Sequence, residues 1–203
     1  MSREMNRLSD EHKEILSRCL VQRPIPLGKI AKELGVPIKV ASLGTGISGQ
    51  IAREGDSYVI KVNRNEARER QRFTIGHEIA HFLLHRDVID SSPNGITDTV
   101  LYRSGASQQI EFEANRLAAD IVMPMALVEK ELKEGFGGVV TEATIEALAN
   151  RFEVPKAAME IRLSHWRNRV TDGNTYAINQ YPDEQIGEVV KPLYPVSWKE
   201  LTK

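Results

Sequence analysis

Cysteine is nearly absent from this sequence, since Cys19 is the only one in 203 residues. A single cysteine excludes a disulfide within the chain, a Cys-x-x-Cys redox motif and a zinc site made of cysteines. Long hydrophobic runs are also missing, because no stretch approaches the ~20 apolar residues of a transmembrane helix. The opening residues MSREMNRLSDEHKE are charged and lack the apolar segment of a signal peptide. We therefore expect a protein of the reducing cytoplasm that does not bind membranes.

The chain also has no excess of charge of one sign. It carries 27 basic and 28 acidic residues, for a formal net charge of −1. This balance gives no general reason to expect binding to nucleic acid, so such a role would need a local basic patch. A length of 203 residues allows one domain of ordinary size with an appendage, or two small domains.

The first part of the chain reads as helices followed by a small sheet. Ser9 and the acidic residues after it are typical of a helix start, which predicts a helix over residues 9–20. Apolar spacing predicts a second helix over 27–36. Residues 38–63 are β-prone, with a turn at 55–56 between two strands. We expect these strands to form a small antiparallel sheet.

Helices dominate the next part of the chain. The pattern predicts a long helix over residues 65–86, a loop over 90–107 and a helix over 108–122. Residues 141–166 are typical of two helices that meet at a turn at 153–155.

The segment RFTIGHEIAHFLLH contains the pattern His-Glu-x-x-His at His77, Glu78 and His81. Histidines four residues apart lie on one face of a helix, where both rings reach the same zinc ion. The glutamate beside the first histidine can then act as general base toward the attacking water. The alternative is a buried helix that contains histidines by chance. A shuffled chain of this composition would show the pattern roughly once in a hundred sequences, so the pattern alone does not decide.

The surroundings of the motif favour a metal site. Apolar neighbours on nearly all sides would bury the three polar side chains: Phe73, Ile75, Ile79, Phe82, Leu83 and Leu84. Burial of such groups without partners costs about 2–7 kcal/mol each, and a metal ion or dedicated partners would remove that cost. Gly76, in the middle of the helix, costs ~1 kcal/mol relative to alanine and therefore indicates a close backbone approach.

A catalytic zinc ion has three protein ligands and an open fourth position, so one more ligand must come from elsewhere. The predicted helix over 108–122 offers Glu111 and Glu113. At ~100° per residue, Glu111 falls within the apolar face of that helix, whereas Glu113 falls opposite, where a solvated charge explains it. We predict Glu111 as the third ligand, with Glu113 as the alternative. Asn115 is placed to hydrogen-bond a ligand, and His85 reads as a solvent-side or supporting residue.

Together these segments make the sequence resemble the ImmA/IrrE family of zinc metallopeptidases, which are gluzincin-like. RPIPLGKIAKELGV looks like the family's N-terminal helix, and the β-prone segments and RFTIGHEIAHFLLH follow in the family's order. EFEANRLAADIVMP matches the family's E-x-E-A-N…MP segment, whose first glutamate, Glu111 here, aligns with the metal-binding glutamate of related gluzincins. The likeness covers about residues 23–125 and weakens beyond Pro124.

The resemblance implies an α+β fold, with a compact zincin-like metallopeptidase domain over residues 1–130. In it, the small antiparallel sheet would pack on the active-site helices. A helix-turn-helix-like segment over 131–170 and a C-terminal tail over 171–203 would follow.

The implied activity is zinc-dependent, site-specific cleavage of a peptide bond in a helix-turn-helix repressor. Cleavage would release genes for stress response, phage induction or mobile-element transfer. One Zn²⁺ per chain would be held by His77, His81 and Glu111, and Mn²⁺ also suits such a ligand set. Glu78 would take a proton from the attacking water and deliver it to the leaving amine.

Two further features of substrate handling stay open. Tyr102, Arg103 and His165 are candidates for stabilising the oxyanion. The strand over 58–63 could pair with an extended substrate or simply pack within the sheet.

The segment over 141–166 leaves two other functions open. Basic residues in and beside it could contact DNA: Arg151, Lys156, Arg162, Arg167 and Arg169. The chain could then be a metal- or redox-sensing regulator that binds DNA, or a toxin-like interaction protein with a vestigial site. Otherwise the helices would dock a repressor or pack on the catalytic domain. Glu78 favours the enzyme, since a purely structural zinc site does not need it.

Overall fold

The computed structural model describes residues 2–92, 95–99 and 105–170. The predicted tail over 171–203 lies outside them, as do Tyr102 and Arg103. Helices and strands follow one another in the order α1 (Arg3–Asn6), α2 (Asp10–Cys19), α3 (Leu27–Glu33), β1 (Ile38–Ala41), β2 (Ile47–Glu54), β3 (Ser57–Asn63), α4 (Arg68–Leu84), α5 (Arg86–Ser91), β4 (Ile96–Thr99), α6 (Gly105–Val122), α7 (Met125–Phe136), α8 (Glu142–Phe152) and α9 (Lys156–Val170).

Four strands form one mixed sheet in the order β1-β3-β2-β4. β2 pairs antiparallel with β3 and with β4, whereas β1 pairs parallel with β3. The prediction of a purely antiparallel sheet is therefore wrong. The turn at 55–56 folds β3 back between β2 and β1, so β3 runs in the same direction as β1. Because β3 is hydrogen-bonded on both sides, it has no edge that could pair with a substrate. Of the two interpretations left open for the strand over 58–63, the structure therefore supports packing within the sheet.

The loop predicted over 90–107 contains a short edge strand. In β4, Ile96 pairs with Ile51 of β2, directly after Gly95 at φ 70. A Cβ on Gly95 would lie 2.1 Å from the carbonyl oxygen of Ile51, so only glycine allows this approach. The Ser, Pro, Asn and Gly residues around β4 obscure the strand in the sequence, since they are the residues that mark loops.

Most predicted helices are present, and their ends have local causes. Ser9 is the N-cap of α2, because its side chain accepts a hydrogen bond from the backbone N–H of His12 at 3.2 Å. Thr141 caps α8 in the same way. The predicted turn between α8 and α9 is confirmed, and Glu153 there adopts the left-handed conformation at φ 51. α7 is not among the predicted helices, although it buries Val128 and Leu132 at a spacing of one helical turn.

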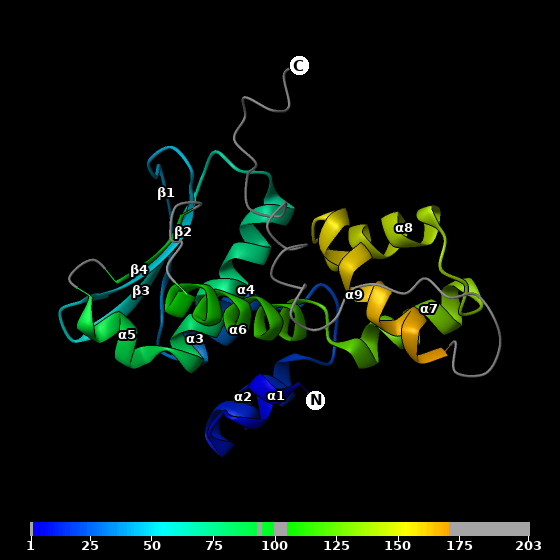
Figure 1. Cartoon of the computed structure of the whole chain (residues 1–203), viewed down its shortest axis with the longest axis horizontal. Helices are drawn as coiled ribbons and strands as arrows, with labels where there is room; N and C mark the ends of the chain where they lie inside the picture. The colour runs from blue at the N-terminus through cyan, green and yellow to red at the C-terminus, as the bar shows by residue number, and fades with distance from the viewer. Residues whose placement is uncertain (1, 93–94, 100–104, 171–203) are drawn as a thin grey trace.

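The helices α4 and α6 lie in the middle of the fold (Figure 1). Figure 1 shows the sheet on one side of these two helices and α7–α9 on the other, with α1 and α2 below. α4 contacts β2 and β3 on one side and packs along α6 on the other. Buried side chains from both sides form one continuous hydrophobic cluster, to which the sheet contributes Ile51, Ile60 and Val62.

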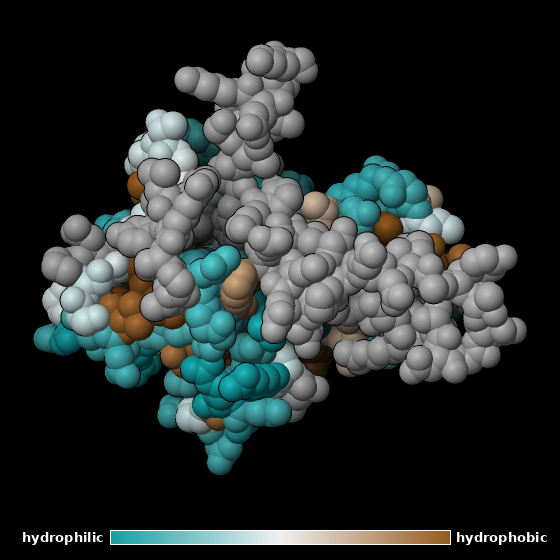
Figure 2. Space-filling model, viewed as in Figure 1, coloured by the Kyte–Doolittle hydropathy of each residue, from teal (hydrophilic) through white to brown (hydrophobic). Residues whose placement is uncertain are grey.

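The described surface is largely hydrophilic in the view of Figure 2. Among the residues whose exposure the structure describes, the large exposed hydrophobic side chains come from separate segments: Val21, Val40, Val88 and Val139. Among the described helices, none combines the length and the apolar character needed to cross a bilayer.

Candidate metal centre

The polar residues of the His-Glu-x-x-His pattern lie on α4 and are buried at the centre of the fold. His77, Glu78 and His81 each have 0 % exposure. The two histidines are one helical turn apart, and their Nε2 atoms lie 2.9 Å from each other. The two rings therefore face the same point, as the spacing in the sequence predicts.

Glu111 reaches this point from α6. Its Oε2 lies 3.1 Å from Nε2 of His77, and its Oε1 lies 3.4 Å from Nε2 of His81. Among the described residues, these three side chains form a group that could hold a metal ion, with ligand atoms within 4.8 Å of one another. A tetrahedral ion with bonds of about 2.0–2.2 Å spaces its ligand atoms about 3.3–3.6 Å apart. The donor set therefore suits a zinc-sized ion, around which the observed spacings of 2.9–3.4 Å would open by a few tenths of an ångström.

Glu113, the alternative ligand, points to a different group of residues. Its Oε2 contacts Nε2 of His85 at 3.2 Å and the guanidinium of Arg7. Glu113 is thus not with His77 and His81. The prediction that Glu113 is a solvated charge is also wrong, because only 17 % of its side chain is exposed.

Burial and neighbouring charge set the protonation of the group. Burial, followed by the proximity of His77, lowers the pKa of His81 to about 4. Burial alone would raise the pKa of Glu111, but its close contacts with the rings of His77 and His81 outweigh that effect and the pKa is lowered. At neutral pH His81 is therefore a neutral imidazole and Glu111 a carboxylate, which are the forms that bind metal.

Each histidine of the pair has a partner on its other ring nitrogen. Nδ1 of His77 lies 3.0 Å from Oδ1 of Asn115, so Asn115 contacts a histidine of the pair as the sequence indicated. Nδ1 of His81 lies 3.1 Å from Nδ1 of His85, whose exposure is only 6 %. Partners of this kind hold an imidazole in one orientation and one tautomer.

The side chain of Glu78 lies directly against Gly49 of the sheet. A Cβ on Gly49 of β2 would lie 2.7 Å from Oε1 of Glu78 and 2.4 Å from Cγ2 of Thr74. Any larger residue at this position would therefore displace the Glu78 carboxylate or push β2 away. Gly49 is not among the predicted site residues, although a glycine inside a strand is a known sign of close approach.

The close approach predicted at Gly76 is confirmed. A Cβ there would lie 2.5 Å from Cγ1 of Val122 on α6. The absence of a side chain at Gly76 lets α4 and α6 lie close enough for Glu111 to reach the two histidines.

The oxyanion candidates remain predictions. Tyr102 and Arg103 lie outside the described residues, and His165 lies in α9 with its side chain outside what the structure describes. The same holds for the side chains of Arg167 and Arg169.

The basic side chains described in α8 and α9 are held in ion pairs. Each has a carboxylate partner: Arg151 with Glu131 at 2.8 Å, Lys156 with Glu142, and Arg162 with Asp120 at 2.7 Å. These pairs offset the local positive charge from which DNA binding was considered.

A comparison with known protein families finds one that matches most of the chain. The family model of the IrrE N-terminal-like domain, Peptidase_M78, matches residues 29–164, more than half of the 203-residue chain. No curated protein matches the chain. The matched span begins after α1 and α2, contains all of α4 and α6, and ends within α9.

Proposed function

Because the chain belongs to the IrrE N-terminal-like domain family, Peptidase_M78, we propose that it is a metal-dependent endopeptidase. In this proposal His77, His81 and Glu111 hold one Zn²⁺, and Glu78 is the general base. Neutral imidazoles with a carboxylate are the usual donors of catalytic zinc. Mn²⁺ remains the second metal that this donor set would accept.

The observation that carries the proposal is the meeting of three donor atoms from two helices beside a buried fourth group. His77 Nε2, His81 Nε2 and the Glu111 carboxylate face one another at 2.9–3.4 Å. Glu78 is fully buried next to His77, although holding the metal does not require it. A site that only stabilised the fold would not require this carboxylate.

Each side chain then has one role in the hydrolysis. A zinc ion held by these three residues would supply Lewis acidity toward the scissile carbonyl and would lower the pKa of a bound water. A carboxylate oxygen of Glu78 accepts the proton of the attacking water and passes it to the leaving amine. Gly49 leaves the space in which that carboxylate lies. Asn115 and His85 keep the imidazole rings of His77 and His81 in place.

The substrate we propose is a helix-turn-helix transcriptional repressor in the cytoplasm. The resemblance to the ImmA/IrrE family supports it, because members of that family cut such repressors. Cleavage would derepress genes of stress response, phage induction or mobile elements. The helix pair α8–α9 would then dock the repressor, since the pairing of its basic side chains favours this role over contact with DNA.

A substitution of Glu78 tests the enzyme directly. The zinc-loaded chain is incubated with the helix-turn-helix repressor encoded next to its gene, and mass spectrometry identifies any new chain ends. We expect one cleavage site, loss of cleavage with a chelator, and loss of cleavage in Glu78→Gln with zinc still bound. Glu69→Gln is the matched control, because Glu69 is an exposed glutamate in the first turn of the same helix. Undiminished cleavage by Glu78→Gln would contradict the mechanism.

A further inference from the structure

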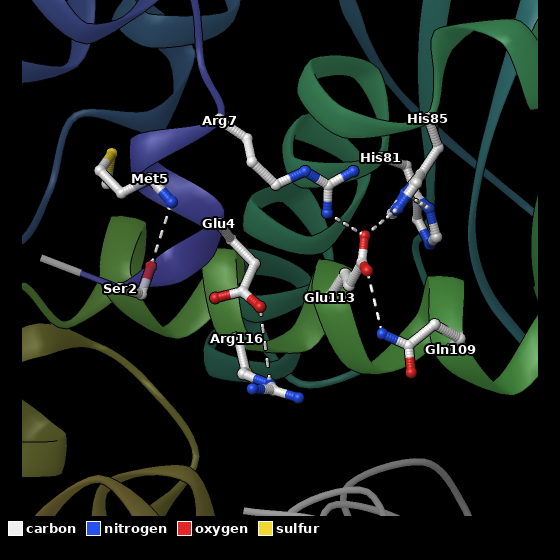
Figure 3. A network of polar contacts seen from close by, with 9 residues as sticks. All are labelled: Ser2, Glu4, Met5, Arg7, His81, His85, Gln109, Glu113 and Arg116. Atoms are coloured by element: carbon white, nitrogen blue, oxygen red, sulfur yellow. Dashed lines mark hydrogen bonds and ion pairs between the residues drawn. The ribbon is translucent and has the colours of Figure 1, made fainter.

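The N-terminal helix α1, which lies outside the family match, is fastened to the helix that carries Glu111. Arg7, the C-cap of α1, pairs with Glu113, and Glu4 of α1 contacts Arg116 at 3.8 Å, so two ion pairs join α1 and its C-cap to α6. Met5 of α1 is buried in the common hydrophobic cluster. Figure 3 shows Glu113 between Arg7 on one side and His85 on the other.

Glu113 is built as an acceptor for these neighbours. Its Oε2 accepts hydrogen bonds from Arg7 and His85, and its Oε1 accepts a hydrogen bond from Nε2 of Gln109 at 2.9 Å. Beside the guanidinium of Arg7 the group is a carboxylate, which can only accept hydrogen bonds.

The Glu113 carboxylate determines which ring nitrogen of His85 carries the proton. Since Glu113 can only accept, Nε2 of His85 carries the proton and donates it to Glu113. A neutral imidazole that carries its proton on Nε2 is an acceptor at Nδ1. The neighbour of that Nδ1 is Nδ1 of His81, at 3.1 Å.

The contacts continue to the metal centre. A histidine that binds a metal through Nε2 carries its proton on Nδ1, and Nδ1 of His85 is the acceptor that lies next to Nδ1 of His81. Nε2 of His81 faces Nε2 of His77 at 2.9 Å and the carboxylate of Glu111 at 3.4 Å. The chain of contacts thus selects the one neutral tautomer of His81 that can bind a metal at this point.

We propose that Arg7, Glu113 and His85 are positioning residues that fix the ring and the tautomer of His81, so that helix α1 helps to set the affinity of the metal centre. The inference rests on the metal site of the proposed function. It adds a segment that the family match does not include and three residues that do not touch the metal.

Zinc affinity of the full chain, measured by competition with a chromophoric chelator, tests the proposal. His85→Phe keeps a ring of similar size but removes both hydrogen bonds, and we expect it to weaken Zn²⁺ binding by about 10–100-fold. His85→Gln can still accept from His81 and donate to Glu113 through its amide, so it should bind within about threefold of the unchanged chain. The ring nitrogens of His81 report the tautomer in nitrogen-15 NMR spectra of the zinc-free chain. We expect protonated Nδ1 in the unchanged chain and in His85→Gln, and a mixture in His85→Phe.

A second set of variants tests the far end of the chain of contacts. Arg7→Met should weaken Zn²⁺ binding by about 3–10-fold, and Arg7→Lys should recover most of that loss. Glu4→Gln is the matched control, because it breaks the other ion pair between α1 and α6 without touching Glu113. Its Zn²⁺ affinity should stay within about twofold of the unchanged chain.

The outcomes separate this inference from the proposed function. If the unchanged chain binds no zinc, the proposed function is refuted. Normal zinc binding in the unchanged chain, in His85→Phe and in Arg7→Met would end only the positioning role. Equal losses in Glu4→Gln and Arg7→Met would also overturn it, since they would show that general docking of α1 is responsible. If urea unfolding shows that His85→Phe does not fold, the pair Arg7→Met and Arg7→Lys still decides.

Discussion

Replacing Gly76 with alanine tests whether Glu111 reaches the histidines because α4 and α6 lie unusually close. The new Cβ would lie 2.5 Å from Cγ1 of Val122, whereas carbon atoms in ordinary contact are about 3.5–4.0 Å apart. Val122 is fully buried, and a valine in a helix has one strongly preferred rotamer, so it has little room to turn away. The helices must then separate by roughly 1 Å. This movement would draw Glu111 away from His77 and His81.

The magnitude follows from two opposing effects. Overpacking in a core lowers the free energy of unfolding by about 1–3 kcal/mol. Alanine in place of glycine in a helix returns ~1 kcal/mol. We therefore expect Gly76→Ala to lower the free energy of unfolding of the metal-free chain by ~1 kcal/mol and to weaken Zn²⁺ binding by at least about tenfold. Gly28→Ala is the matched control, because a Cβ on this exposed helical glycine would meet nothing within 4 Å. It should raise the free energy of unfolding by about 0.4–1 kcal/mol and leave zinc affinity unchanged.

A compensating substitution makes the test specific. Val122→Ala removes the opposing methyl group, so the double variant should recover both stability and zinc affinity relative to Gly76→Ala. We expect a favourable coupling of about 1–2 kcal/mol in the double-mutant cycle, measured by urea unfolding. Zinc affinity is measured on the same four proteins by chelator competition. If Gly76→Ala stabilises the chain as Gly28→Ala does, and the two substitutions simply add, the close packing of α4 on α6 does not govern the site.

Two other predictions follow from the geometry and the electrostatics of the centre. Gly49→Ala should lower kcat by at least about tenfold with little change in Zn²⁺ affinity, because the added methyl group displaces Glu78 rather than a ligand; a kcat equal to that of the unchanged enzyme would contradict it. The metal-free chain should lose about 2–3 kcal/mol of unfolding free energy as the pH falls from about 6.5 to 4, because His81 has a pKa of about 4 when folded and 6.5 when unfolded. Above pH 6.5 both states are neutral, and below it the unfolded state binds the proton first, so stability falls with pH. Urea unfolding between pH 7 and pH 4 measures the loss, and His81→Gln should lack this part of it; identical pH profiles for the two proteins would count against the buried neutral imidazole.

The parts of the site that the sequence predicted are those with a periodic, local signal. A spacing of four residues places His77 and His81 on one helix face whatever the rest of the fold does. The choice of Glu111 over Glu113 as the carboxylate beside them came from helical geometry too, because only Glu111 shares the apolar face of its helix. The close approach at Gly76 was visible as an unfavourable residue in a helix, for which close packing is the physical reason.

The parts that the sequence missed depend on contacts between distant segments. The pairing of β1 with β3 is parallel because β3 is inserted between β1 and β2, and the composition of the strands carries no record of that order. β4 is short, and residues typical of loops flank it, so the sequence shows no strand periodicity there. Arg7 and Glu113 are 106 residues apart, and each alone looks like a surface charge. Only their placement side by side, next to a buried His85, shows what they contact.

The central claim is that one divalent ion is held between α4 and α6 by His77, His81 and Glu111. Anomalous diffraction at the zinc absorption edge, from crystals of the zinc-loaded chain, tests it most directly. We expect a single strong peak per chain at about 2.0–2.2 Å from Nε2 of both histidines and from a carboxylate oxygen of Glu111. A peak bound by Glu113 in place of Glu111, or a loaded crystal with no peak between the two helices, would contradict the claim.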